Sequence, residues 1–178
     1  MADGPDPDAL QALVDKDEIH EVIQRLARGT DRLDHELMVE CYWPDGFDDH
    51  NSFRGGPEEF AEWVCQVLPH FQATMHQVGA PHIRLDGDVA QVDTYCIAHH
   101  VSHPDDKGAQ TDMVLGLRYV DRFERRQDGA RRAWRIAKRV CAFDWTYTVE
   151  IDATRSFRFE DDFTVGRRDR EDVTDKGV

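Results

Sequence analysis

The sequence predicts an α+β fold, in which three N-terminal helices pack on a strongly curved, mostly antiparallel sheet that encloses a pocket. Apolar residues recur at helical spacing in three segments before residue 72, and long alternating segments follow. No internal repeat or linker divides the chain. Helices gathered on one face of an antiparallel sheet define this class, and a sheet that curves around them forms a cone with a hollow interior.

Each helix has its own boundary signals. The first is expected to begin near Asp8 and to weaken at Gly29, because apolar residues keep a helical period between them. A short second helix over residues 35–42 follows Asp34, whose side chain is a suitable N-cap. Pro57, followed by two glutamates, opens the third helix, because proline fits the first turn and acidic groups suit the helix dipole.

Residues 74–103 predict one long β-hairpin, because an Asp-Gly pair ending at Gly87 lies between two apolar runs. Folding the chain there places His76 roughly opposite His99. A bulge at residues 79–81 leaves the register open, and a slip by one residue moves every side chain to the other face. Two histidines toward one end of a hairpin make a candidate proton-transfer site, because histidine titrates near neutral pH.

Further strands are expected at residues 47–53, 111–125 and 133–147. We therefore predict one domain over residues 1–152. Residues 153–178 carry three phenylalanines in a charged background, which indicates an extension that partly covers the pocket or a neighbouring subunit and ends in a disordered stretch.

The composition excludes several classes of partner. The formal net charge is −14, and phosphates attract basic surfaces, so nucleic acid and anionic membranes are poor partners. No apolar run approaches the roughly 18 residues of a membrane span. The N-terminus lacks the basic and apolar regions of a secretory signal, so we expect a cytoplasmic protein. The four cysteines are widely spaced among apolar residues, which favours reduced core thiols over disulfides or metal ligands.

Five stretches of the chain carry a family resemblance. They are LARGTDRLDHELMVECYWPD, the apolar helix after Gly-Gly-Pro, ATMHQVG, DGDVAQVDTYCIAHH, and RYVDRFERR with the WRIAKR that follows it. They resemble the SnoaL-like branch of the nuclear-transport-factor-2-like superfamily, which includes scytalone dehydratase, a hexachlorocyclohexane dehydrochlorinase and bile-acid 7α-dehydratase. The resemblance covers about residues 9–150 and implies a cone-shaped α+β barrel, commonly a homotrimer, that runs acid–base eliminations without a cofactor.

The resemblance also implies catalytic residues. The family's aspartate at the end of the first helix matches Asp31, and its histidine on the strand after the third helix matches His76. A second polar residue after the next turn matches His99, which competes with His100 for the inward position. An arginine in the last strand of the dehydrochlorinase matches Arg139.

Five other residues are candidate substrate contacts. His50 stands where scytalone dehydratase has a strand tyrosine, and Tyr95 lies on the predicted inner face of its strand. The remaining three are Trp43, Phe47 and Arg118, for which the core or a solvated face is the alternative location. The sequence contains no H-x-H or H-E-x-x-H pattern, so we expect no metal site.

A His–Asp pair suits removal of a carbon-bound proton, because the carboxylate fixes the imidazole tautomer and stabilises the imidazolium. We predict a cofactor-independent lyase of aromatic compound catabolism. His76, oriented by Asp31, would eliminate water or a small fragment such as formaldehyde from a hydrophobic aromatic or polycyclic molecule. Two alternatives remain. One is an isomerase or cyclase of the ketosteroid-isomerase or polyketide-cyclase type, and the other is a non-catalytic β subunit of a ring-hydroxylating dioxygenase.

Overall fold

The computed structural model describes residues 4, 6–152, 159–160, 162–169 and 171–176. Its helices are α1 (Pro7–Arg32), α2 (His35–Glu40), α3 (Pro57–Val67), a 3-10 turn (Leu68–His70) and α4 (Val173–Lys176). Its strands are β1 (Tyr42–Asp49), β2 (Arg54–Gly55), β3 (Phe71–Val78), β4 (His82–Asp86), β5 (Val89–Ser102), β6 (Gln110–Asp128) and β7 (Arg131–Ile151). Within this described part, no helix combines the length and apolar character that crossing a bilayer requires.

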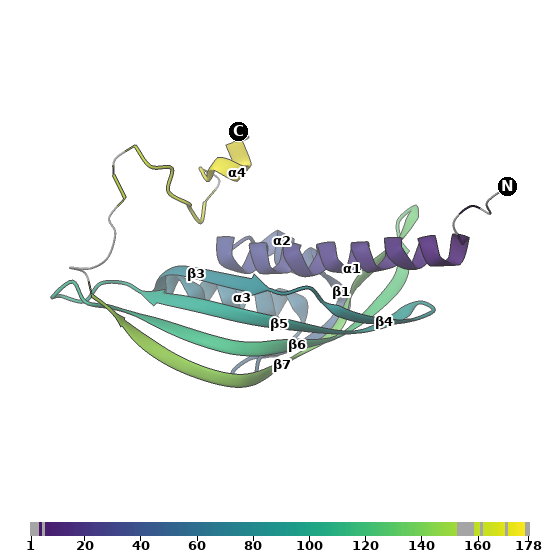
Figure 1. Cartoon of the computed structure of the whole chain (residues 1–178), viewed down its shortest axis with the longest axis horizontal. Coiled ribbons are helices and arrows are strands. Elements are labelled where there is room, and N and C mark those ends of the chain that lie inside the picture. The colour runs from purple at the N-terminus through teal and green to yellow at the C-terminus, as the bar shows by residue number, and fades with distance from the viewer. Residues whose placement is uncertain (1–3, 5, 153–158, 161, 170, 177–178) are drawn as a thin grey trace.

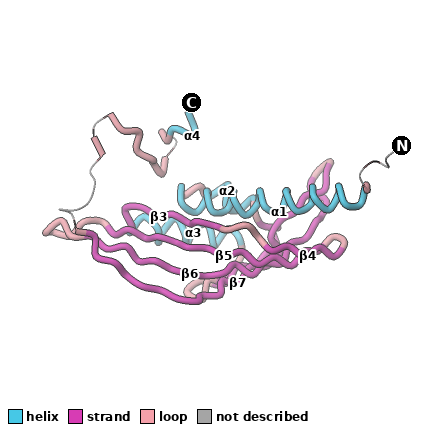
Figure 2. Tube along the Cα trace, viewed as in Figure 1, coloured by secondary structure: helices cyan, strands magenta, loops and turns pink. Residues whose placement is uncertain are grey.

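Helices α1, α2 and α3 lie on one face of a single sheet, which curves beneath them (Figures 1 and 2). The strand order is β2-β1-β7-β6-β5-β3, and β4 pairs with β5. β1 runs parallel to β7, and the other paired strands are antiparallel. The predicted α+β class is therefore confirmed, with a curved sheet that remains open at β2 and β3.

The ends of α1 and α2 follow from their caps. α1 ends where Leu33 adopts a left-handed conformation with φ of 57°, and the Asp34 side chain then caps α2 by accepting a hydrogen bond from the Leu37 amide at 3.0 Å. α2 ends at Glu40, earlier than predicted, because the chain passes directly into β1, where the Tyr42 ring is buried. These two caps place the last turn of α1 against the sheet.

The main core fills the space between α1, α3 and the sheet. Its largest fully buried side chains are those of Trp134, Tyr42, Phe60, Phe123, Ile19 and Ile23. Burying one such side chain contributes about 1.5–3 kcal/mol to folding. All four cysteines are free thiols, as predicted, and Cys41, Cys96 and Cys141 are buried. A smaller buried cluster on β5, β6 and β7 continues this inner surface toward the pocket.

The predicted hairpin over residues 74–103 forms with an interruption. Both β3 and β4 pair with β5, and residues 79–81 lie between them. Across this interruption the register shifts, so that His76 pairs with Ala98. Counting residues outward from the turn at Gly87 ignores this shift. The predicted pairing of His76 with His99 is therefore wrong by one residue.

The shift determines which of two adjacent histidines faces inward. Neighbouring side chains on a strand point to opposite faces, so His100, and not His99, shares the inner face with His76. The predicted inward position of His99 is therefore wrong. Its side chain lies on the outer face, where Nδ1 is 2.7 Å from Oδ2 of Asp112.

The extension after residue 152 is described in part. Phe157 lies outside the described residues, whereas the rings of Phe159 and Phe163 lie 5.8 Å apart and are exposed. The segment around Arg167 and α4 returns to the end of α1, near α2 (Figure 1).

Candidate active site

Asp31, in the last turn of α1, joins the helix layer to β3. Its Oδ1 accepts hydrogen bonds from Nδ1 of His76 at 2.7 Å and from Oγ1 of Thr74 at 2.9 Å, and its Oδ2 accepts the His76 amide at 2.8 Å. Burial raises the pKa of Asp31, but these bonds outweigh burial and hold it below its ordinary value. Asp31 is therefore an ionised acceptor at neutral pH. Because His76 donates from Nδ1, Nε2 carries the lone pair that a substrate can meet.

A cavity of about 220 Å³ lies between α1, α3 and the inner face of the sheet. Most of its wall is apolar, formed by side chains that include Leu26, Phe60, Trp63, Val64, Leu117 and Phe143. Seven polar side chains also reach it: Thr30, His50, Ser52, His76, His100, Tyr119 and Arg139. An apolar cavity with a few convergent polar groups is the usual form of a small-molecule site.

His50 provides a second His–Asp pair at this cavity. Its Nδ1 contacts Oδ1 of Asp48, and Oδ2 of Asp48 accepts a hydrogen bond from the Tyr42 hydroxyl at 2.6 Å. Asp48 is completely buried, so these partners offset the cost of removing its charge from water. The ring of His50 stacks on Phe60 with 5.0 Å between centroids. Since β1 and β3 lie on opposite sides of β7, β6 and β5, the two His–Asp pairs approach the cavity from different sides.

Arg139 on β7 brings a positive charge to the cavity wall. It is 3% exposed and bonds both carboxylate oxygens of Asp121, at 2.8 and 2.7 Å, with its guanidinium 4.0 Å from the ring centroid of Tyr119. Burial lowers the pKa of Arg139, but the Asp121 carboxylate outweighs burial and holds it well above its ordinary value. The guanidinium is therefore always positively charged. Asp121 accepts hydrogen bonds from Nε and Nη2, which leaves other N–H groups of Arg139 available as donors.

His100 takes the inward position predicted for His99. Its ring meets that of His76 edge-on at 5.5 Å and that of Phe71 at 5.1 Å. Burial, with a smaller effect from nearby His76, lowers the pKa of His100 to about 4, so the ring is neutral at neutral pH. Its Nδ1 is buried and has no hydrogen-bond partner within the described residues. A buried polar atom without a partner at a cavity wall is a candidate contact for a bound molecule.

Two predicted site residues lie on the outer face of the sheet. Tyr95 is 67% exposed, and the guanidinium of Arg118 lies 5.9 Å from its ring centroid. Arg118 also bonds the Asp144 carboxylate at 3.1 Å. Neither side chain reaches the cavity, because the register that turns His100 inward turns Tyr95 outward with His99.

Two predicted aromatic contacts also lie elsewhere. Trp43 donates its indole N–H to the Glu124 carbonyl at 2.8 Å, and the guanidinium groups of Arg126 and Arg135 lie over its ring. Phe47 is partly exposed on β1, outside the cavity lining. The structure thus brings together Asp31, His76, His50 and Arg139 from the predicted set.

The sequence analysis missed Tyr119 as a polar group of the cavity, and it considered His100 only as the alternative to His99. The signal for Tyr119 is its alternation with Leu117 and Asp121 on β6, which all face inward. Within the described residues, no group of three or more His, Cys, Asp or Glu side chains is arranged to hold a metal ion.

Comparisons with known proteins agree with this architecture. A model of the SnoaL-like domain matches residues 11–140. The hexachlorocyclohexane dehydrochlorinase LinA-type3 from Novosphingobium barchaimii superposes with a TM-score of 0.68 at 16% identity, over 85% of this chain and 99% of that one. A candidate scytalone dehydratase from Novosphingobium aromaticivorans gives 0.66 at 18% identity, over 80% and 92% of the two chains.

A third solved structure, an NTF2-like protein with a cystatin-like fold from Novosphingobium aromaticivorans, gives a TM-score of 0.59 at 23% identity, over 76% of this chain and 85% of that one. A search of curated protein sequences found no match. At these identities the solved structures show a shared fold. Because the domain model spans most of the chain, this protein belongs to the SnoaL-like family.

Proposed function

We propose that the protein is a cofactor-independent lyase that eliminates a small group from a hydrophobic molecule, with His76 as general base. The observation that supports this is the Asp31–His76 pair at the wall of an apolar cavity. Nε2 of His76 would take a proton from carbon, the C–H electron pair would form the new double bond, and Asp31 would stabilise the imidazolium. A general base of this kind contributes about 10²–10⁴-fold to the rate.

The departing group needs a hydrogen-bond donor, and three side chains at the same cavity can supply one. The Arg139 guanidinium is charged, and the Tyr119 hydroxyl stays protonated because burial raises its pKa well above the ordinary value. The ring of His50, held by Asp48 through Nδ1, is the third candidate donor. An elimination of water or halide divides the work between a base for the carbon-bound proton and a donor for the departing oxygen or halide. Release of a small carbonyl fragment would instead start with removal of a hydroxyl proton and cleavage of a C–C bond.

The cavity also limits the size of the substrate. A dry apolar cavity of about 150 Å³ accommodates benzene, and this one measures about 220 Å³. Phe60 and Trp63 provide an aromatic part of its wall. We therefore favour a molecule of one or two rings over the polycyclic class that the sequence left open.

The test is an assay of a panel of one- and two-ring alcohols and halides, with products identified by mass spectrometry. The variant His76→Ala should lose at least about 100-fold in turnover, the lower end of general-base catalysis, with an unchanged circular dichroism spectrum. His82→Ala is the matched control, because His82 is exposed on β4 and outside the cavity. Wild-type turnover by His76→Ala would exclude the proposed base. A product with the mass of its substrate would indicate an isomerase or cyclase.

A further inference from the structure

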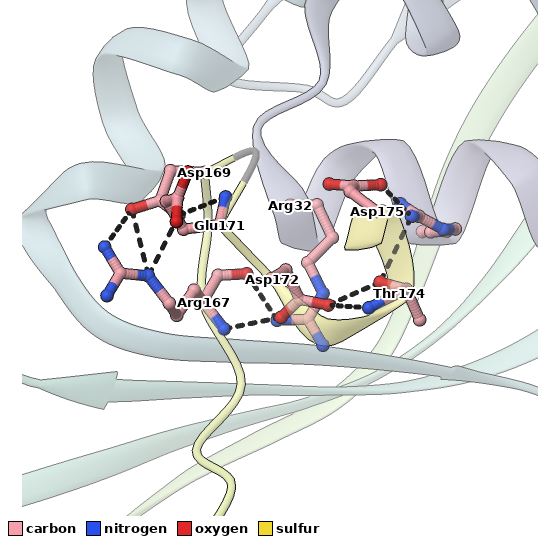
Figure 3. Close-up of polar contacts among 8 residues, drawn as sticks. Arg32, Arg167, Asp169, Glu171, Asp172, Thr174 and Asp175 are labelled. Atoms are coloured by element: carbon pink, nitrogen blue, oxygen red, sulfur yellow. Dashed lines mark hydrogen bonds and ion pairs between the residues drawn. The ribbon is translucent and has the colours of Figure 1, made fainter. Parts of the chain in front are cut away.

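The C-terminal segment contacts Arg32 at the end of α1, the residue that follows Asp31 in the sequence (Figure 3). Arg32 donates a hydrogen bond to the Arg167 carbonyl at 2.8 Å and lies 3.5 Å from the carboxylate of Asp172. Asp172 is 2% exposed and also accepts the Arg167 amide at 2.6 Å. These polar contacts fix the backbone next to Arg168, a residue distant in sequence from every other group of the site.

Arg168 extends from this segment to the wall of the cavity. Its Nη1 donates to the carbonyls of Leu68 and Phe71, at 3.1 and 3.0 Å, and the side chains of both residues line the cavity. Its Nη2 donates to Oγ1 of Thr74 at 2.8 Å. Three hydrogen bonds from one guanidinium hold the group rigidly, because its planar fork fixes all the donors together.

The contact with Thr74 connects Arg168 to the Asp31–His76 pair. A threonine hydroxyl has a single hydrogen, and because it accepts from Arg168, that hydrogen is directed to Oδ1 of Asp31 at 2.9 Å. The same oxygen accepts Nδ1 of His76. Asp31 therefore receives hydrogen bonds from two sides, one of them backed by the charge of Arg168.

We propose that Arg168 is a positioning residue that acts through Thr74 on the Asp31–His76 pair. This inference rests on the proposed role of that pair as the base. Arg168 orients the Thr74 hydroxyl, and its positive charge draws electron density of the Asp31 carboxylate away from the imidazolium of His76. Burial lowers the pKa of Arg168 and the Asp31 carboxylate opposes that lowering, which agrees with a direct electrostatic coupling between the two groups.

The direction of the effect follows from the groups around His76. Asp31 faces it from α1, His100 from β5, and Arg168 acts from the C-terminal segment through Thr74. His100 is neutral, so Arg168 is the cation of this set. When the charge of Arg168 is removed, Asp31 stabilises the imidazolium of His76 more strongly, and His76 retains its proton to higher pH. The expected change is upward, because loss of a nearby cation favours the charged form of the imidazole.

The experiment compares Arg168→Gln with Arg167→Gln. Both remove one charge from adjacent residues, but the Arg167 side chain pairs with Asp169 at the surface. The readout is an NMR titration of the His76 ring protons, which needs no substrate. The midpoint should rise in Arg168→Gln and stay unchanged in Arg167→Gln and in the charge-conserving Arg168→Lys. Thr74→Val, which leaves Arg168 in place and removes the connecting hydroxyl, should raise it in the same direction.

Equal midpoints in Arg168→Gln and the control would overturn the inference, as would a loss of stability in Arg168→Gln without any change of midpoint, because that result shows a purely structural role. If Arg168→Gln does not fold, Arg168→Met, which keeps an apolar stem and removes the charge, decides between the same outcomes. Failure of the proposed function would be seen separately, as wild-type turnover in His76→Ala. Once a substrate is found, the acidic limb of the kcat/KM profile should move with the NMR midpoint.

Discussion

Three imidazoles reach one cavity, and their surroundings give them different properties. His76 and His50 each have a carboxylate at Nδ1, which fixes the orientation of the ring and the nitrogen that it presents to the cavity. Among the described residues no carboxylate bonds Nδ1 of His100, and burial lowers the pKa of this ring to about 4. The cavity thus combines two imidazoles suited to proton transfer with one suited only to a neutral hydrogen bond.

His100 should make stability depend on pH. The ordinary pKa of histidine, about 6.5, applies to the unfolded chain, which therefore binds a proton between pH 6.5 and 4 that the folded state excludes. Its contribution is complete above about pH 6.5 and is lost as pH falls toward 4, by roughly 2–3 kcal/mol in the free energy of unfolding. Urea unfolding at a series of pH values should show a shallower fall in His100→Gln than in wild type.

His82→Gln serves as the control for this prediction, because it removes an exposed histidine by the same substitution. Its stability should follow the wild-type curve between pH 6.5 and 4. If His100→Gln followed that curve as well, the lowered pKa of His100 would be contradicted.

At the level of elements, local signals were sufficient for the helices and their caps. The Asp34 cap and the start of α3 at Pro57 lie where predicted, because each depends on residues within one turn of the helix. Asp31 and His76 were predicted through the family resemblance, because the local signals end the first helix near Gly29, before Asp31, whereas α1 continues to Arg32. The inward face of β5 could not be predicted, because the interruption at residues 79–81 shifts the pairing of β3 with β5 by one residue. No residue within β5 indicates that shift.

The predicted aromatic contacts failed for a related reason. The side chain of Trp43 finds a hydrogen-bond acceptor in the carbonyl of Glu124, far along the chain, and Tyr95 follows the register of β5. Such partners depend on tertiary structure, and composition alone does not reveal which aromatic side chains line a cavity and which pack elsewhere.

Gly46 in β1 allows this strand to pack closely against β7. At the bulge between Tyr42 and Phe47, a Cβ on Gly46 would lie 2.8 Å from the Trp43 carbonyl and 3.2 Å from that of Ile136. Both contacts are with backbone, so the strand would have to move. Gly46→Ala should lower the free energy of unfolding by about 1–3 kcal/mol, measured by urea denaturation.

Gly79→Ala is the control for that substitution, because its added Cβ meets the Tyr95 carbonyl at an ordinary 3.6 Å. It should cost much less than Gly46→Ala. Equal stabilities for the two variants would show that β1 adjusts without cost. Since β1 also carries Asp48, the NMR signals of the His50 ring should move in Gly46→Ala and stay in place in Gly79→Ala.

At the level of the whole molecule, the outer face of the sheet is the prominent surface. It exposes the large apolar side chains of Tyr95, Ile97, Trp145, Tyr147 and Val149. The rings of Trp145 and Tyr147 stack at 5.5 Å with 12° between their planes, and the indole lies over Gly116, which leaves room for it by having no side chain. An exposed apolar surface of this kind marks an interface more often than a solvated face.

We propose that copies of this chain associate through that face, as the trimer implied by the family resemblance. Trp145→Arg should reduce the mass measured by light scattering at micromolar concentration to that of one chain, because a charge would have to be buried in the interface. Leu13→Arg, at an exposed apolar position on α1, should leave the mass unchanged. A wild-type protein with the mass of a single chain would refute the proposal.

The hydrogen bonds of Asp31 have a consequence for how this family member can change. Its carboxylate accepts hydrogen bonds from the His76 ring, the Thr74 hydroxyl and the His76 amide, all on β3. It therefore connects α1 to the sheet, and in the proposed reaction it would also orient the base. Selection for a durable scaffold and selection for chemistry therefore act on the same two oxygen atoms. A substitution of Asp31 would therefore affect both stability and activity. A change of substrate is expected to arise from substitutions in the apolar wall of the cavity instead.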